Sequence, residues 1–196
     1  FNSAKAAVIA NPLNNSYINW QRFNRTKIPR VKELTDMGIS SFPVLRYRHD
    51  WGLFYTPSFI TNGLPTWSQK WEWWEYCFAM AYLYAKIADC TIFEFGNEPD
   101  LGNQGGLNQQ EQVQAVEIGH SAVRAAVKAA TGKKAFIISC GLSSKPEYLP
   151  PLDALPDTVL EALSWHTYEG QNTGESGQAF GWLSTTKKDG YNTEYG

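Results

Sequence analysis

The fold is decided by one strand–helix–strand stretch, residues 91–139, which reads TIFEFGNEPDLGNQGGLNQQEQVQAVEIGHSAVRAAVKAATGKKAFIIS. In its centre, the residues of one apolar face recur at spacings of three and four over 113–130, which predicts an amphipathic helix. Asn108 precedes this helix with an acidic residue three positions later, the spacing of a capping box. Short apolar runs at 91–95 and 135–139 predict strands on either side. Two strands joined through a helix in this way favour a parallel βαβ unit.

The same alternation of strands and helices continues along the whole chain. Strands are predicted at 4–10, 39–45, 91–95, 135–139, 163–168 and 191–195. Helices are predicted at 29–38, 67–89, 108–132, 157–162 and 179–187. Because no linker or low-complexity segment divides this pattern, it predicts one α/β unit with a parallel sheet.

Two parallel α/β architectures are compatible with this order. A doubly wound sheet would place a Gly-rich phosphate turn after its first strand, whereas Asn11 and Pro12 follow the first predicted strand here. A (β/α)8 TIM barrel uses roughly 31 residues for each of its eight strand–helix units, so a chain of this length holds about six of them. We therefore expect residues 1–196 to form an incomplete (β/α)8 barrel, a single partial domain with about strands 2 to 7 present.

Charge and cysteine content exclude several classes of function. The chain carries 17 Lys and Arg against 19 Asp and Glu, a formal net charge of −2, and it has no basic stripe of the kind that binds nucleic acid. Its apolar runs are shorter than the roughly 18 residues that a membrane span needs. Three scattered cysteines, without CxxC or HExxH spacing, predict buried thiols and no metal site.

Aromatic residues are unusually frequent, at 14% of the chain with eight tryptophans. Flat apolar rings on a nearly neutral surface suit a weakly charged ligand with a CH-rich face, such as a sugar. The alternative is an aromatic core, which we favour for Trp67, Trp71, Trp73 and Trp74 because Trp is mostly buried in proteins. His120, on the apolar face of the central helix, is likewise expected to be a core residue rather than a ligand.

The first candidate for chemistry is the carboxyl end of the strand predicted at 91–95. Asn97, Glu98 and Pro99 follow it directly and place an amide beside a carboxylic acid. In a parallel barrel this end of each strand faces the site, so Glu98 lies where a general acid is needed and Asn97 could bond a substrate hydroxyl. Taken alone, a glutamate that caps the next helix is an equally good interpretation.

Two further predicted strands also end in polar residues. One ends in Ser164, Trp165, His166, Thr167 and Tyr168, and the other in Asn192, Thr193, Glu194 and Tyr195. His166 and Tyr168 are two positions apart, so they share one side of their strand. Glu98 and Glu194 supply the pair of carboxyl groups that glycoside hydrolysis requires, one neutral to protonate the leaving oxygen and one ionised to attack the anomeric carbon.

With these motifs in this order, the sequence resembles clan A of the glycoside hydrolases, the retaining (β/α)8 enzymes that include cellulases, mannanases, xylanases and xylosidases. In that clan an Asn-Glu-Pro segment ends strand 4, which implies that Glu98 is the acid/base and that Asn97 bonds the 2-hydroxyl of the sugar. A His-x-Tyr segment ends strand 6, which implies site positions for His166 and Tyr168, the latter orienting the nucleophile. The clan's strand-7 nucleophile implies that role for Glu194.

The resemblance extends to the segment after the strand predicted at 39–45. His49 and Trp51 are placed there as in glycoside hydrolase family 5, and Trp165 beside the histidine of strand 6 is expected to line the same site. Many clan members carry an Arg near the end of strand 2, and the first predicted strand has none. Either Arg46 or Arg48 takes that place, or the strand at 4–10 is assigned wrongly.

The resemblance implies a retaining glycosidase that cleaves a β-linked polysaccharide or oligosaccharide by double displacement, with a carbohydrate as its partner and no metal or organic cofactor. Residues 1–196 would then be a partial catalytic domain that lacks the first and last strand–helix units, a fragment of a secreted or extracellular enzyme. The alternatives are a non-catalytic carbohydrate-binding barrel and a transglycosylase that uses the same residues. A weaker alternative is a phosphate-handling barrel isomerase. It would need a Gly-rich phosphate loop near strands 7 and 8, which this sequence does not show or does not reach.

Overall fold

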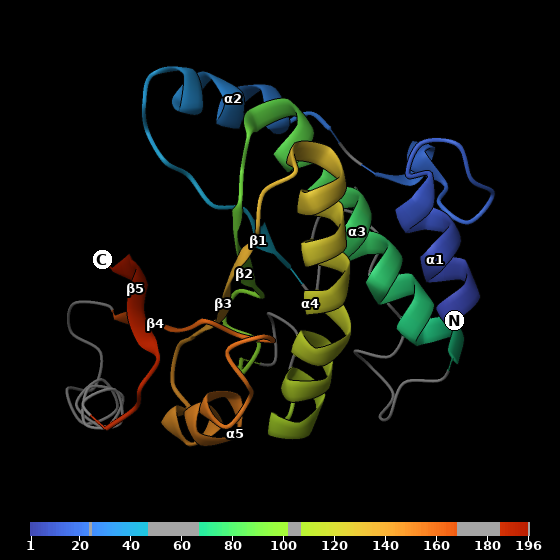
Figure 1. The fold of residues 1–196 in the computed structure, drawn as a ribbon. Coiled ribbons are helices and arrows are strands. Elements are labelled where there is room, and N and C mark those ends of the chain that lie inside the picture. Colours follow the sequence, from blue (N-terminus) through green and yellow to red (C-terminus); the bar gives the residue numbers. More distant parts are fainter. Residues whose placement is uncertain (24, 47–66, 102–106, 168–184, 196) are drawn as a thin grey trace.

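The computed structural model describes residues 1–23, 25–46, 67–101, 107–167 and 185–195 (Figure 1). Within these residues five strands form one sheet. The strands are β1 (Val44–Leu45), β2 (Ile92–Phe95), β3 (Phe136–Leu142), β4 (Ala162–Thr167) and β5 (Asp189–Tyr195). The helices are α1 (Asn2–Ala10), α2 (Ile28–Asp36), α3 (Trp67–Ala88), α4 (Gln109–Thr131) and α5 (Leu149–Asp153), with short 3-10 helices η1 (Trp20–Arg22) and η3 (Pro146–Tyr148).

The sheet is parallel throughout, and its strands lie side by side in chain order. β1 pairs with β2, β2 with β3, β3 with β4 and β4 with β5. Parallel neighbours need a crossover between them, and α3 precedes β2 while α4 connects β2 to β3. The predicted α/β fold with a parallel sheet is therefore confirmed.

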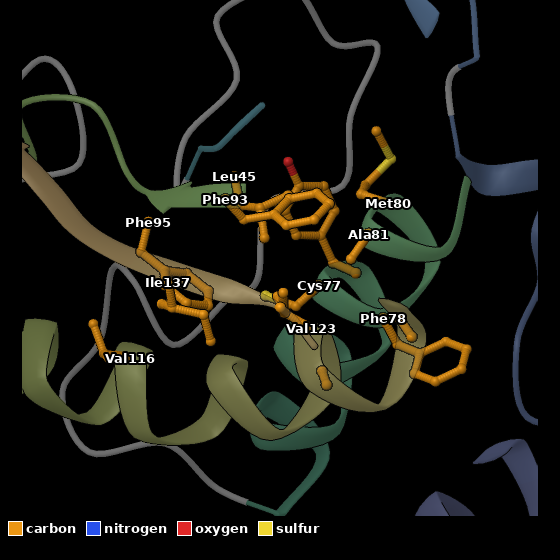
Figure 2. Close-up of a cluster of buried hydrophobic side chains, with 14 of the residues drawn as sticks. Leu45, Cys77, Phe78, Met80, Ala81, Phe93, Phe95, Val116, Val123 and Ile137 are labelled. Carbon is orange, nitrogen blue, oxygen red and sulfur yellow. The ribbon is translucent and has the colours of Figure 1, made fainter. Parts of the chain in front are cut away.

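The main hydrophobic core lies between the sheet and the pair of long helices α3 and α4, which pack against each other (Figure 1). Figure 2 shows part of this core, with Phe93 and Phe95 from β2 together with Cys77 from α3 and Val116 from α4. A Cβ on Gly119 of α4 would lie only 2.4 Å from the ring of Phe95. The close approach of α4 to β2 therefore depends on a glycine at this position.

The two long helices follow from different features of the sequence. α4 begins with the predicted capping box, in which the N–H of Glu111 donates to Asn108 Oδ1 at 3.0 Å and the N–H of Asn108 donates to Glu111 Oε2 at 2.8 Å. It ends at Gly132, whose φ of 74° is left-handed. The predicted bounds of this helix are confirmed to within a residue at each end.

α3 is apolar around most of its circumference because it is covered on several sides. Trp73 and Trp74 are fully buried. Their indole N–H groups donate to the Ala115 carbonyl at 2.8 Å and to Ser121 Oγ at 3.1 Å, both on α4. Burial of an indole with a satisfied N–H is what a core tryptophan needs. The core interpretation of these two tryptophans is confirmed, as is the burial of all three cysteines, which are free thiols.

Two predicted elements are wrong. Residues 4–10, predicted as a strand, belong to α1, which is rich in the good helix former Ala and buries only Ala4 and Val8, one turn apart. The helix predicted at 157–162 is absent from this described part of the chain, because Ala162 already begins β4. The short helices lie earlier, in η3 and α5, where proline occupies the first turn. The helix predicted at 179–187 falls largely outside the described residues.

The face of the sheet opposite the long helices carries polar side chains. Glu94 stands between two core phenylalanines on β2, so it points to this opposite face. Thr193 Oγ1 of β5 donates to Glu94 Oε1 at 2.9 Å. In a flat sheet β2 and β5 would lie about 14 Å apart, which these two side chains cannot span. The sheet is therefore strongly curved around its polar face.

Candidate functional site

The carboxyl end of β2 turns into the segment that carries Glu98. Gly96 has a φ of 77° and Glu98 a φ of 45°. A left-handed conformation is strained for a residue with a side chain, and such strain gathers at functional sites. Asn97 forms an isolated bridge with Gly141 of β3, and the N–H of Glu98 donates to the Gly141 carbonyl at 2.8 Å. The backbone of β3 thus holds Asn97 and Glu98 in place.

Glu98 and His166 meet across β3. His166 Nδ1 lies 3.2 Å from Glu98 Oε1, within hydrogen-bond distance. Both residues are buried, with 9% of Glu98 and 5% of His166 exposed. A Cβ at position 141 would lie 2.1 Å from Nε2 of the imidazole. The glycine of β3 therefore leaves the space that the ring occupies, and two predicted site residues are brought together.

Position 194 reaches the same edge of the sheet through β5. Trp165 pairs with Asn192, and the next pair is His166 with Glu194, so one extra residue of β5 is inserted between the two pairs. A bulge of this kind re-aims the residues that follow it. It places the backbone of Glu194 in register with His166. The side chain of Glu194, and with it the predicted separation of the two carboxyl groups, lies outside the described part of the structure.

Asp100 connects the segment after β2 to the loop after β3. Its carboxylate accepts the backbone N–H groups of Ser143, Ser144 and Lys145 at distances from 2.8 to 3.2 Å. Only 2% of Asp100 is exposed. Sequence reasoning missed this residue, although an acidic residue just after Asn-Glu-Pro was a visible signal. Its bonds fix the two loops that border Glu98.

A buried polar cluster of three side chains lies deeper on the same curved face. Ser164 Oγ donates to Glu94 Oε1 at 2.7 Å, Thr193 Oγ1 donates to the same oxygen at 2.9 Å, and the two hydroxyl oxygens are 2.7 Å apart. Sequence reasoning missed this cluster too. A charged residue in the middle of a four-residue apolar strand was the signal that could have revealed it.

The remaining predicted site residues have different outcomes. Trp165 belongs to the hydrophobic core, with 8% of its surface exposed, and it alternates along β4 with Ser164 and His166. The expectation that Trp165 contacts a substrate stays a prediction, and its side chain packs in the core on the side of β4 opposite to Ser164 and His166. Arg46 directly follows β1 at the same edge of the sheet, and its backbone is hydrogen bonded to the buried phenol of Tyr76. The predicted residues His49, Trp51 and Tyr168 lie outside the described residues.

The groups around Glu98 limit the chemistry of this edge. Burial, and then the charges of Asp100 and Glu94, raise the pKa of the Cys140 thiol well above its usual value, so Cys140 is not a thiolate nucleophile.

Among the residues that the structure describes, no group of three His, Cys, Asp or Glu side chains could hold a metal ion. In the same part of the chain, no helix is long and apolar enough to cross a membrane.

The candidate site therefore consists of Glu98 in contact with His166, Asn97 bridged to β3, and the backbone of Glu194 in register with His166. Comparison of the chain with protein-family models, with curated protein sequences and with solved structures finds no match. Its function is therefore inferred from this geometry and from the sequence motifs.

Proposed function

We propose that the protein is a retaining glycoside hydrolase that cleaves a β-linked polysaccharide or oligosaccharide, with Glu98 as acid/base and Glu194 as nucleophile. One observation carries the proposal: His166 contacts the carboxyl group of Glu98 through its side chain and pairs with Glu194 through its backbone. The two glutamates of the sequence motif are thus connected through one residue at one edge of the sheet. A general acid and a nucleophile must share such a position to act on one glycosidic bond.

In the first step, Glu98 gives its proton to the glycosidic oxygen while the bond from that oxygen to the anomeric carbon breaks. A carboxylate oxygen of Glu194 forms the new bond to this carbon, and the leaving group departs as an alcohol. Glu98 becomes ionised as a result. A neutral His166 that carries its proton on Nδ1 donates to Glu98 Oε1 both before and after this step, which leaves the other carboxyl oxygen to carry the proton that Glu98 gives to the leaving group.

In the second step, a water molecule attacks the anomeric carbon and loses a proton to Glu98. The bond between the sugar and Glu194 breaks, which restores the ionised nucleophile and the protonated acid. The sugar keeps its original anomeric configuration because it is inverted twice. No metal or organic cofactor takes part in either step.

The proposed architecture is an incomplete (β/α)8 barrel. Support comes from the parallel strands in chain order, from the curvature of the sheet around its polar face, and from the position of Glu98 and His166 at carboxyl strand ends. With the strand at 4–10 replaced by a helix, the five described strands would take the places of barrel strands 3 to 7. Residues 1–196 would be part of the catalytic domain of a secreted or extracellular enzyme.

The other residues of the motif receive roles by the same proposal. Asn97 bonds the 2-hydroxyl of the sugar, and Arg46 supports the site from the end of β1. His49 and Trp51 contact the substrate, and Tyr168 orients the nucleophile. The partner is a carbohydrate, and neither nucleic acid nor a membrane is involved.

The test uses the full chain and a panel of aryl β-glycosides with good and poor leaving groups. Glu98→Ala should slow poor leaving groups far more than good ones, because a good leaving group departs without protonation, and azide should rescue its second step. Glu194→Ala should abolish turnover of both kinds of substrate. Glu117→Ala, at an exposed position on α4, is the matched control and should behave like the unaltered protein.

The outcomes separate the proposal from its alternatives. Binding of a glycan without any turnover would identify a non-catalytic carbohydrate-binding barrel. Products longer than the substrate that depend on both glutamates would identify a transglycosylase. Turnover that survives both glutamate substitutions would refute the assignment of the two residues.

A further inference from the structure

The buried cluster of Glu94, Ser164 and Thr193 has no role in the proton transfers described above. Its three residues come from β2, β4 and β5, and 2% of Glu94 and none of Ser164 is exposed. One oxygen, Glu94 Oε1, accepts from both hydroxyl groups. A buried carboxyl group is costly unless it is hydrogen bonded, so these contacts need an explanation in the fold or in the function.

The cluster joins the three strands that carry the candidate site. Glu94 lies four residues before Glu98, Ser164 two residues before His166, and Thr193 directly before Glu194. β2 and β4 are separated by β3, and β5 lies one strand further on. Backbone pairing connects each strand only to its neighbours, whereas the Glu94 side chain reaches across the curved face to both others.

The cluster also coincides with the two irregularities of the sheet. The β3–β4 register shifts between Ile138 and Gly141, where Ser139 Oγ accepts the N–H of Ser164 at 2.8 Å. The β4–β5 register shifts at Thr193, which lies between the pair Trp165–Asn192 and the pair His166–Glu194 and has no pairing partner on β4. Bulges weaken ladder pairing locally, so side-chain bonds at these positions determine how the strand ends are held.

We propose that Glu94 is a positioning residue that fastens the carboxyl ends of β4 and β5 to β2, and so sets the mutual positions of Glu98, His166 and Glu194. The catalytic part of this inference rests on the glycosidase function proposed above. Glu94 lies four residues before Glu98 along β2, and we assign it no contact with the substrate. Its effect is transmitted through the hydroxyl of Ser164 to the strand of His166, and through that of Thr193 to the strand of Glu194.

The most selective perturbation is Thr193→Val, which removes the hydroxyl and keeps the shape of the side chain. Thr193→Ser keeps the hydroxyl and should retain the unaltered behaviour, which makes it the conservative rescue. Thr158→Val, at an exposed position before β4, is the matched control. Ser164→Ala removes the second donor to Glu94 and should resemble Thr193→Val.

The first measurement is hydrogen exchange of backbone amides, which needs no substrate. In Thr193→Val, amides of β5 and of the carboxyl end of β4 should exchange at least roughly tenfold faster, the effect expected for a lost hydrogen bond in a buried network. Amides of α4 should exchange as before. Equal acceleration in α4 and β5 would show a general loss of stability, and no acceleration would show that the cluster does not hold the strands. Either result would overturn the inference.

The second measurement is turnover of aryl β-glycosides. Thr193→Val should lower kcat by about tenfold or more while KM stays within about twofold, because misplaced groups slow the chemical step more than binding. Unchanged kcat together with locally faster exchange would overturn the positioning role and leave only a structural one. If the unaltered protein turns over no glycoside, the proposed function fails, and the exchange measurement still decides whether Glu94 fastens the strands.

Discussion

Replacement of Gly141 by alanine tests the contact between Glu98 and His166 with the smallest possible change. Gly141 lies in β3 between the two residues, and its backbone carbonyl accepts the N–H of Glu98. The φ angle of Gly141 is not positive, so its backbone conformation is one that alanine can adopt. The effect of Gly141→Ala must therefore come from the added methyl group.

The structure gives the size of this effect. The new Cβ would lie 2.1 Å from Nε2 of His166, and 2.7 and 2.8 Å from two ring carbons. An ordinary contact is at least 3.4 Å, so the ring must move by about 1.3 Å. A shift of that size breaks a 3.2 Å hydrogen bond between His166 and Glu98. Misplacement of a catalytic group by about 1 Å can lower kcat by roughly 100-fold.

Gly119→Ala provides the matched control for overpacking. Its Cβ would lie 2.4 Å from the buried ring of Phe95, in the core between α4 and β2. Both variants should lose about 1–3 kcal/mol of unfolding free energy, measured by urea denaturation. Only Gly141→Ala should lose activity towards aryl glycosides with poor leaving groups, measured at a temperature where both proteins are folded. A Gly141→Ala protein with kcat within twofold of the unaltered protein would refute the role of the His166 contact.

Three further predictions concern stability. Asp100→Asn should lower the unfolding free energy by about 1–3 kcal/mol in urea denaturation, because an amide places N–H groups against three backbone donors. Burial lowers the pKa of His120 below its ordinary 6.5, so the unfolded chain binds more protons than the folded chain at acidic pH. The unfolding free energy therefore falls as the pH drops from about 7 to 5. His120→Gln should flatten this part of the pH dependence of the urea midpoint. Asn108→Ala should cost about 1 kcal/mol in thermal unfolding because it removes the cap of α4.

Periodicity and capping in the sequence predicted the central part of the fold well. α4 is long and has one apolar face with a cap at each end, so local signals agree with tertiary packing. The segment at 4–10 was predicted wrongly because a short apolar run fits a buried strand and a helix equally well. Its Ala-rich composition favours the helix, and only two of its residues meet the core.

The candidate site could be predicted only in part. Glu98 and His166 follow apolar strands, so the parallel topology predicts that they lie at the same edge of the sheet, whereas their contact also depends on β3 lying between the two strands. Gly141 and Thr193 could not be recognised, because their importance comes from bulges in strand pairing and from contacts between strands that are not neighbours. Alternation along β4 places the side chain of Trp165 on the opposite side of the strand from His166, in the core.

The central claim is that Glu194 attacks the sugar while Glu98 protonates the leaving group. The most direct measurement is the mass of the protein and of its peptides after reaction with an activated 2-deoxy-2-fluoro β-glycoside, which slows the second step and lets the glycosyl-enzyme accumulate. The peptide that contains Glu194 should gain the mass of one fluorosugar, and Glu194→Gln should gain none. Turnover of aryl β-glycosides with no adduct, or an adduct on a different residue, would contradict the account.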